Sequence, residues 1–361
     1  MAALSCTDPG RAKLVAKVSK LWRWEFWPTW LFYIPVYPWI AWLAIRYRGL
    51  SIPTAANPAI PQGGIVGESK AEILAKLPSE WVLPFARLES GASDGRMALL
   101  ARFMNECLTC FPVILKPDSG ERGASVRLVR DESSAHAYFE QTSGPVLAQA
   151  YHPGPYEAGI FYYRMPDEPK GRIFSITDKQ FSYLCGDGIH TVEQLIWKHP
   201  RFRMQARTFL KRHAANADRI LKSGESLRLA EAGNHCQGTL FKDGSRLITP
   251  MLADAIDAIA REFDGFYFGR FDVRYADADL LRNGGGFQII ELNGVTSEST
   301  NIYDPAWTML RAYRTLFRQW SILFAIGAAN RARGIRSTSI MQVLAHVNTN
   351  YRLRRLDPLA D

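Results

Sequence analysis

The clearest alternation of apolar and polar residues lies between residues 269 and 293. Phe271, Val273 and Tyr275 alternate with polar side chains, and a second alternating run begins at Phe287. The run Asn-Gly-Gly-Gly at 283–286 separates the two and is typical of a turn. The pattern therefore predicts two antiparallel strands joined as a β-hairpin.

The same alternation divides the predicted hairpin into two faces. Arg270 and Asp272 share one face of the first strand, and Glu291 and Asn293 share a face of the second, opposite Ile290. If the polar faces coincide, two carboxylates, a carboxamide and a guanidinium meet above a hydrophobic floor. Hard oxygen ligands of this kind suit Mg²⁺ together with substrate phosphates. The alternative is an ordinary amphipathic hairpin whose charged face is solvated.

Shorter patterns predict the other elements. Residues 51–67, rich in Pro, Ala and Gly, are expected to form an extended linker or loop, and 146–151 an edge-like strand. Other strands are expected at 111–116, 126–129, 157–163 and 172–177. Helices are expected at 69–77, 96–107, 191–197, 203–221, 252–263 and from 304 to 331.

Residues 26–45 form an apolar and aromatic stretch without a charged residue. Its length reaches that of a transmembrane helix. However, Pro28, Pro35 and Pro38 interrupt a helix, and Trp and Tyr occur throughout the stretch instead of gathering at its ends. We expect a segment that lies in a membrane interface or dips into it. A spanning helix, and a soluble core or partner surface, are the alternatives.

Composition and charge narrow the class of protein. The chain has 361 residues, 47% of them hydrophobic and 22% charged, which is typical of a globular protein with one large or two medium domains. The net charge of +9, with basic clusters near both ends, favours an anionic partner: a phosphate-rich substrate, nucleic acid or an acidic membrane. No RNP, KH, zinc or helix-turn-helix pattern supports nucleic acid.

The cysteines provide little evidence for a site. There are five, an odd and scattered number, which favours a reducing compartment over a disulfide framework. Cys107 and Cys110 form one CxxC without a second pair for zinc, so we expect them to be buried apolar groups.

A lysine ends the apolar strand at 111–116. Lys116 is followed by a loop rich in Gly and Ser, and its ammonium could bind phosphate oxygens while the loop amides wrap them. The loop is not a Walker A sequence, because the lysine precedes the glycines. A surface hairpin that ends in a lysine is the alternative. Further along, a turn at 152–155 leads Glu157 into the next strand.

Taken in this order, the pieces from about Lys70 to Asn301 resemble the ATP-grasp superfamily. The strand that ends at Lys116 and its loop resemble that family's phosphate strand and lid, and Gln-Ala-Tyr at 149–151 is similar to its adenine hinge. Gly-Arg-Phe-Asp-Val at 269–273 and Ile-Ile-Glu-Leu-Asn-Gly at 289–294 resemble its paired metal-binding strands.

The resemblance implies an α+β protein with the ATP-grasp fold, in which two α/β subdomains clasp ATP. From the aromatic stretch itself, we expect an N-terminal membrane-associating segment before these subdomains. The expected divisions are a basic and aromatic segment, a linker with N-terminal helices, an N-lobe with the phosphate lid, a C-lobe with the metal site and basic C-terminal helices, at 1–50, 51–110, 111–183, 184–301 and 302–361.

The resemblance also implies roles for single residues. Arg270 would stabilise the transferred phosphoryl group as the catalytic residue, and Asp272, Glu291 and Asn293 would bind two Mg²⁺ ions, with Mn²⁺ as an alternative. Glu157 would hold the ribose. The complete implied ATP-binding set is Lys70, Lys116, Ser119, Gly120, Gly123, Ser125, Gln149, Tyr151 and Glu157.

Within the superfamily, the chain is most similar to D-alanine–D-alanine ligases and to cyanophycin-synthetase-like amide ligases. This implies an EC 6.3-type carboxylate–amine ligase that works through an acyl phosphate on a small-molecule acid and amine. We expect it in the cytoplasm at the inner face of a membrane, without a nucleic-acid partner. The alternative is a membrane-attached protein that binds ATP and Mg²⁺ and has phosphotransferase or no ligase activity.

Two departures from those ligases concern substrate choice. Their separate N-terminal α/β domain is replaced here by the aromatic stretch, and residues 294–300 read Gly-Val-Thr-Ser-Glu-Ser-Thr. His190 and His235, in segments similar to the cyanophycin-like group, could position a second substrate or be hydrogen-bonded loop histidines.

Overall fold

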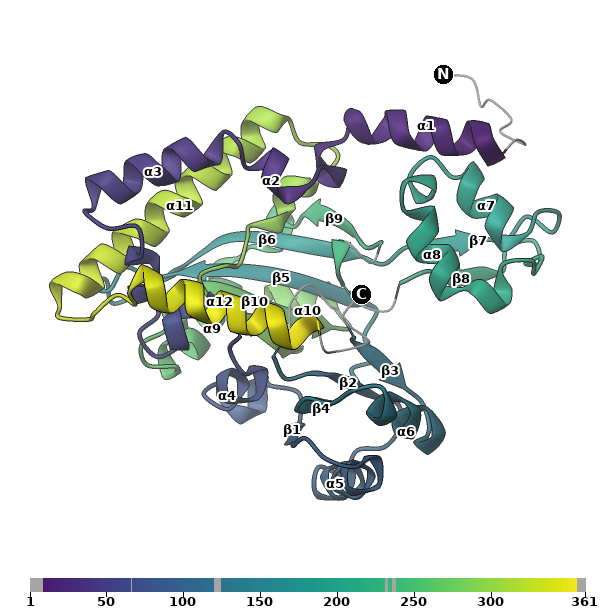
Figure 1. Cartoon of the computed structure of the whole chain (residues 1–361), viewed down its shortest axis with the longest axis horizontal. Helices are drawn as coiled ribbons and strands as arrows, with labels where there is room; N and C mark the ends of the chain where they lie inside the picture. Colours follow the sequence, from purple (N-terminus) through teal and green to yellow (C-terminus); the bar gives the residue numbers. More distant parts are fainter. Residues whose placement is uncertain (1–8, 66, 120–124, 231–232, 236–237, 356–361) are drawn as a thin grey trace.

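The structure is a computed structural model that describes residues 9–65, 67–119, 125–230, 233–235 and 238–355 (Figure 1). Within these residues the chain mixes helices and sheets. A five-stranded sheet lies at the centre, a four-stranded sheet lies below it in the view, and a long helix pair covers it from above.

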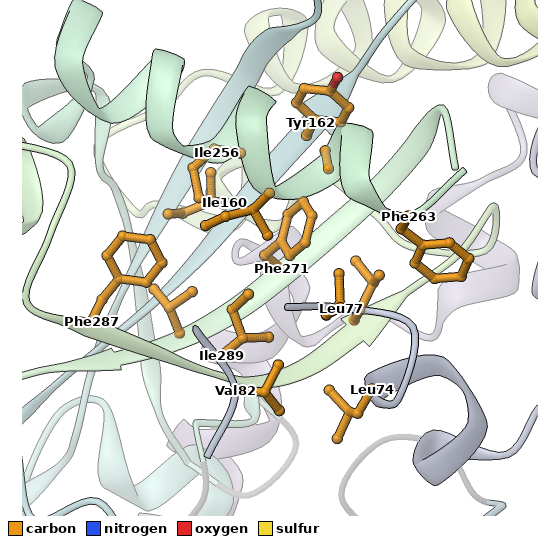
Figure 2. Close-up of a cluster of buried hydrophobic side chains, with 14 of the residues drawn as sticks. Leu74, Leu77, Val82, Ile160, Tyr162, Ile256, Phe263, Phe271, Phe287 and Ile289 are labelled. Carbon is orange, nitrogen blue, oxygen red and sulfur yellow. The ribbon is translucent and has the colours of Figure 1, made fainter. Parts of the chain in front are cut away.

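The larger sheet is antiparallel, with the order β11-β10-β5-β6-β9. Its apolar face packs against α9 (Pro250–Glu262), and Figure 2 shows Ile160, Ile256, Phe271 and Phe287 meeting there. Phe271 and Phe287 thus lie on the buried side, as the alternation predicts. The strands are β5 (Tyr156–Tyr163), β6 (Arg172–Gln180), β9 (Leu240–Asp243), β10 (Phe268–Tyr275) and β11 (Phe287–Asn293).

The predicted hairpin is present as β10 and β11, with two differences. The connection includes a short helix, α10 (Ala278–Arg282), ahead of the glycines. The register also shifts: Asp272 pairs with Glu291 and Val273 with Ile289, so Ile290 is the extra residue of a β-bulge. Ile290 is therefore absent from the hydrophobic cluster to which Ile289 belongs, and its predicted place on the apolar face is wrong.

The smaller sheet has the order β1-β4-β2-β3. Helices α5 (Ser93–Glu106) and α6 (Glu132–Glu140) cover it and share its hydrophobic core. The predicted edge strand at 146–151 is an interior strand, because the short β1, which shows no pattern of its own, pairs along its outer side. The strands are β1 (Phe85–Leu88), β2 (Val113–Pro117), β3 (Arg127–Val129) and β4 (Val146–Ala150).

Of the two structures expected for residues 51–67, an extended linker or a loop, the described residues form a loop with two short turns. All residues of the turn η2 (Ile52–Ala55) are buried, the turn η3 (Pro61–Gly63) buries Gly63, and Asn57 between the two turns is fully buried. Its side chain accepts from the backbone N–H of Phe268 at 2.9 Å and donates to the Phe268 carbonyl at 2.7 Å. The segment is thereby fixed to the start of β10.

The N-terminal stretch is helical and packs along a C-terminal helix. Helix α3 (Val36–Arg46) lies beside α11 (Met309–Ala332), and both run in the same direction (Figure 1). The N-terminal helices also include α1 (Pro9–Leu21), η1 (Trp24–Phe26) and α2 (Thr29–Phe32). In the described ranges, every helix is too short or too polar to cross a membrane.

A small helical subdomain follows β6. The single helix expected at 203–221 is broken into η5 (Phe202–Gln205), α8 (Ala206–Arg212) and η6 (Ala214–Asn216). Its own core holds it together. It also contains α7 (Val192–Lys198), β7 (Tyr183–Cys185) and β8 (Ser226–Arg228), while α4 (Lys70–Leu74), η4 (Ser79–Trp81), η8 (Ser245–Leu247), η9 (Thr300–Tyr303) and α12 (Ile340–Arg355) complete the described elements.

Candidate active site

The face of the larger sheet opposite α9 is polar at its centre. Strand register aligns Asp272 of β10 with Gly159 of β5 and Glu291 of β11. The neighbouring row aligns Arg274 with Glu157 and Lys179. Because residues two apart on a strand share a face, both rows point to the same side. The expected meeting of the polar hairpin residues is thus supported by the pairing.

Arg270 and Asp272 form a bidentate pair on this face. Arg270 Nε donates to Asp272 Oδ1 at 2.8 Å and Nη2 donates to Oδ2 at 3.1 Å, while Nη1 donates to the Glu298 carbonyl at 3.1 Å. Gly159 lies directly beneath the pair. A Cβ there would lie 3.0 Å from Arg270 Cδ and 3.1 Å from Asp272 Oδ1, so the glycine makes room for the pair.

A buried ladder of charges continues from Asp272. Lys179 Nζ lies 3.0 Å from Asp272 Oδ2 and 2.9 Å from Glu157 Oε1, and Arg274 Nε lies 2.9 Å from Glu157 Oε2. Both oxygens of Glu157 are thus paired with cations. Its role as a ribose ligand remains a prediction.

These pairings set the charge states. Burial would raise the pKa of Asp272, but Arg270 and Lys179 lower it to about 2. Burial would likewise lower the pKa of Lys179, yet Asp272 and Glu157 hold it above its usual value. The pKa of Glu157 lies below its usual value, because Lys179 and Arg274 outweigh its burial. The ladder is therefore fully charged at neutral pH.

Lys116 connects the two sheets. It lies on β2 of the smaller sheet, and its ammonium donates to Gln149 Oε1 of β4 at 3.0 Å and to the carbonyl of Ile290 on β11 at 3.0 Å. The β-bulge leaves that carbonyl free of a ladder partner on β10. Burial lowers the pKa of Lys116 to about 8, with Glu291 partly compensating.

Lys70, Ser119 and Ser125 also belong to the predicted ATP-binding set, and only Lys70 is shown close to Lys116. Lys70, at the start of α4, donates to the Asp118 carbonyl at 3.4 Å, and its charge lowers the pKa of Lys116, so the two ammoniums are near each other. Ser119 is exposed, and the buried Ser125 accepts from the Tyr138 hydroxyl through its carbonyl at 3.0 Å.

Three more of these predictions concern the lid and the hinge. Tyr151 directly follows β4 and is half-buried. Gly120 and Gly123 lie outside the described residues.

The predicted metal ligands provide a mixed donor set. Asp272 shares its oxygens with Arg270 and Lys179. The Glu291 carboxylate, in contrast, has no hydrogen bond or ion pair within the part of the chain that is described, and Asn293 Nδ2 is buried without a partner there. Turning this amide over would place its oxygen at the same position. Glu291 and Asn293 thus fit a hard cation such as Mg²⁺.

The oxygen donors for a metal ion at this site come from Glu291, Asn293 and Asp272. Among the described residues, no group of three His, Cys, Asp or Glu side chains could hold a metal ion. Substrate phosphates would have to supply further ligands, as is usual for Mg²⁺.

Two central residues of the ladder, Lys179 and Arg274, were missed by the sequence analysis. Alternation along β6 places Ser175, Thr177 and Lys179 on one face, and this signal could have found the lysine. A charged residue near a strand end is normally solvated, which hid its role.

The remaining candidates lie away from the ladder. His190 Nδ1 lies 2.6 Å from Asp187 Oδ2, and His235 Nε2 lies 3.2 Å from Glu25 Oε2, as expected of hydrogen-bonded loop histidines. Cys107 is half-buried and Cys110 is exposed, so the expectation of buried thiols is wrong for Cys110.

Comparison with known proteins identified structures but no sequence relatives. No protein-family model and no curated protein matches the chain. A bifunctional glutathione synthetase from Pasteurella multocida is 17% identical with a TM-score of 0.36, over 69% of this chain and 36% of that one. The ATP-grasp ligase PsnB in complex with a minimal precursor is 13% identical with a TM-score of 0.36, over 70% of this chain and 59% of its own.

A D-alanine–D-alanine ligase from Bacillus anthracis complexed with ATP is also similar. It is 14% identical with a TM-score of 0.39, over 74% of this chain and 67% of its own. The chain spans about a third of the glutathione synthetase and 59% of PsnB. These partial matches assign no role to any residue. Of these three proteins, PsnB is named as an ATP-grasp ligase and the Bacillus anthracis protein as a D-alanine–D-alanine ligase.

Proposed function

We propose that this protein is an ATP-dependent carboxylate–amine ligase of the ATP-grasp type, acting through an acyl-phosphate intermediate. The observation that carries the proposal is the hydrogen bond from Lys116 to the Ile290 carbonyl, 3.0 Å long. It brings a buried cation of the smaller sheet next to Glu291 on the larger sheet. The ammonium of Lys116, the carboxylate of Glu291 and the guanidinium of Arg270 could then bind the phosphates and metal that phosphoryl transfer uses.

The residues divide the work of binding and catalysis. Lys116 and Lys70 would bind the phosphates of ATP, and Arg270 would take up charge on the transferred phosphoryl group. Glu291, Asn293 and an oxygen of Asp272 would hold Mg²⁺. When bound, the cation supplies neutralisation of the phosphate charge. Because these groups are fixed before the reaction, electrostatic stabilisation should contribute most of the rate enhancement.

The proposed reaction has two bond exchanges. A carboxylate oxygen of the substrate attacks the γ-phosphorus, the bond from phosphorus to the bridging oxygen breaks, and ADP leaves. An amine nitrogen then attacks the acyl carbon, the carbon–oxygen bond to phosphate breaks, and the amine proton passes to the departing phosphate. The products are an amide, ADP and phosphate.

The direct test is a screen of the purified protein for ADP release with pairs of small carboxylic acids and amines. Release stimulated only when both partners are present, with an amide in the product mixture, is the expected result. A stable phosphorylated product from a single hydroxylated substrate would replace amide formation by kinase chemistry. No stimulation by any acid would contradict the ligase proposal.

We further propose that the N-terminal helices dock the protein on an acidic membrane, at its cytoplasmic face. Large apolar side chains remain exposed along these helices: Trp22 is 83% exposed, Trp30 63% and Ile45 78%. Lys17 and Arg46 are also exposed on the same helices. Exposed aromatic groups next to cations are typical of segments that lie in a membrane interface.

Sedimentation with vesicles tests the docking. We expect binding to vesicles with an anionic lipid, and weak binding to vesicles of neutral lipid. Replacing Trp30 and Ile45 by Gln should reduce binding roughly tenfold through lost apolar contact. The Leu99→Gln variant, which changes an exposed apolar side chain of α5, is the matched control. Equal binding by all three proteins would contradict the proposal.

A further inference from the structure

We propose that Tyr33 of the N-terminal segment is a positioning residue for Arg270, acting through Glu298. This inference rests on the proposed function for the role of Arg270. It makes the aromatic segment a part of the site, in addition to its proposed part in membrane docking.

A continuous chain of contacts joins the two residues. The Tyr33 hydroxyl donates to Glu298 Oε2. The backbone carbonyl of the same Glu298 accepts from Arg270 Nη1 at 3.1 Å. Glu298 therefore contacts the N-terminal segment through its side chain and the Arg270 guanidinium through its backbone carbonyl.

The backbone around Glu298 is fixed on both sides. The hydroxyl of Ser299 lies 2.6 Å from that of Ser175 on β6, and Ser299 N–H donates to Gln319 Oε1 of α11 at 2.9 Å. Gln319 Nε2 in turn donates to the Ser297 carbonyl at 3.0 Å. With its neighbours fixed in this way, the main freedom left to Glu298 is the direction of its side chain.

That direction decides which cation or donor the carboxylate meets. The Glu298 charge acts on Arg270, since it contributes to raising the pKa of the guanidinium. If Tyr33 did not hold it, the carboxylate would be free to turn towards Arg270 and compete with a phosphoryl group for the same N–H donors. Tyr33 thus keeps an intrinsic anion away from the catalytic cation.

The environment of Tyr33 suits this task. The pKa of its hydroxyl is raised well above the usual value by burial and by Glu298, so it stays a proton donor. The next residue, Ile34, is 50% exposed, so this turn reaches from the surface of the molecule to the site. A change at that surface therefore has a short route to Arg270.

The first test uses turnover. Tyr33→Phe keeps the ring and removes the donor, and should lower kcat roughly tenfold while the KM for ATP stays within about twofold. Glu298→Gln in the same protein removes the competing charge and should restore kcat. The control Tyr183→Phe removes a hydroxyl from a ring of β7 that is 48% exposed and should leave kcat unchanged. A wild-type kcat in Tyr33→Phe, or no rescue in the double variant, would overturn the proposal.

The second test does not depend on activity. In protein labelled with ¹⁵N-arginine, the Nε–H signal of Arg270 is the one missing in Arg270→Lys. Tyr33→Phe should shift this signal and Tyr183→Phe should not. An unshifted signal would overturn the positioning role, whatever reaction the protein catalyses. A shifted signal in a protein without ligase turnover would contradict the proposed function alone.

Discussion

Arg270 and Asp272 depend on each other and on Lys179, and removing either should have a large effect on catalysis. Arg270→Ala or Asp272→Asn should lower ADP release by about 10²-fold or more. Both variants should still fold. In Arg270→Ala, Lys179 still pairs with Asp272, and in Asp272→Asn it still pairs with Glu157. Far-UV circular dichroism and a turnover assay check both points.

The control is a second arginine–aspartate pair. Arg246, which is exposed, lies 2.6 Å from Asp178 and outside the ladder, so Arg246→Ala should leave turnover unchanged. Wild-type ADP release by Arg270→Ala would refute the catalytic role.

The lowered pKa of Lys116 has a consequence for nucleotide binding. Phosphate oxygens bind the charged ammonium, so bound ATP should raise the pKa of Lys116 from about 8. ATP affinity should therefore be independent of this group below pH 8 and fall as the pH rises above it. Calorimetry at pH 7 to 9.5, in buffers of different ionisation enthalpy, should detect proton uptake on binding.

The variant Lys116→Arg is the control, because arginine stays charged throughout this range. Its ATP affinity should be flat where that of the wild type falls. The same pKa shift affects stability. The folded protein binds fewer protons than the unfolded chain between pH 8 and 10.5, so the free energy of unfolding should rise with pH there.

A substitution at Gly159 tests whether the Arg270–Asp272 pair requires a residue without a side chain beneath it. Gly159→Ala places a methyl group 3.0 Å from Arg270 Cδ and 3.1 Å from Asp272 Oδ1. We expect a loss of about 1–3 kcal/mol in the free energy of unfolding, together with reduced turnover. Gly144→Ala, where a Cβ meets nothing within 4 Å, is the matched control. Equal urea midpoints for the two variants would argue against close packing at Gly159.

At the scale of elements, the segment 51–67 should be as important to stability as a strand. Asn57 satisfies backbone groups of Gly63, Tyr267 and Phe268 with a fully buried side chain. Asn57→Ala leaves these groups unsatisfied and should lower the free energy of unfolding by about 3 kcal/mol or more. Urea unfolding against the exposed Asn105→Ala measures the difference. If the segment 51–67 behaved as a linker, Asn57→Ala and Asn105→Ala would have the same free energy of unfolding.

The elements also show which features a sequence can predict. Alternation was sufficient for β10 and β11 and for the polar face with Arg270 and Asp272, because both are local properties of the strands. The bulge at Ile290 depends on the register between β10 and β11, and alternation along a single strand does not show that register. Strand β1 is too short to alternate visibly, so β4 was expected at an edge.

Tertiary packing overrode composition in the segment that was expected to be a linker. The prolines and glycines of 51–67 are typical of an exposed loop, yet Asn57 ties the segment to β10, and Ile52, Ala55, Ala56 and Ile60 are buried. The residues predicted for ATP and Mg²⁺ lie on both sheets, and their roles remain predictions.

At the scale of the molecule, the N-terminal helices form one side of a shared core. Phe32, Val36 and Leu316 are buried in one cluster between these helices and α11, and Leu43 and Phe324 in the next. Removing the N-terminal helices would therefore expose the apolar side of α11. Point substitutions at exposed positions such as Trp30 separate membrane docking from folding, whereas a truncation does not.

The hydrogen bond from Lys116 to the Ile290 carbonyl also bears on timing. Each excursion that moves the two sheets apart must first break it, and phosphate oxygens would compete for the same ammonium protons. If ATP binds at this interface as proposed, opening of the sheets, in place of collision, would set the maximum rate of nucleotide association. Lys116 would then both bind the phosphates of ATP and hold the two sheets together through its hydrogen bond to the Ile290 carbonyl.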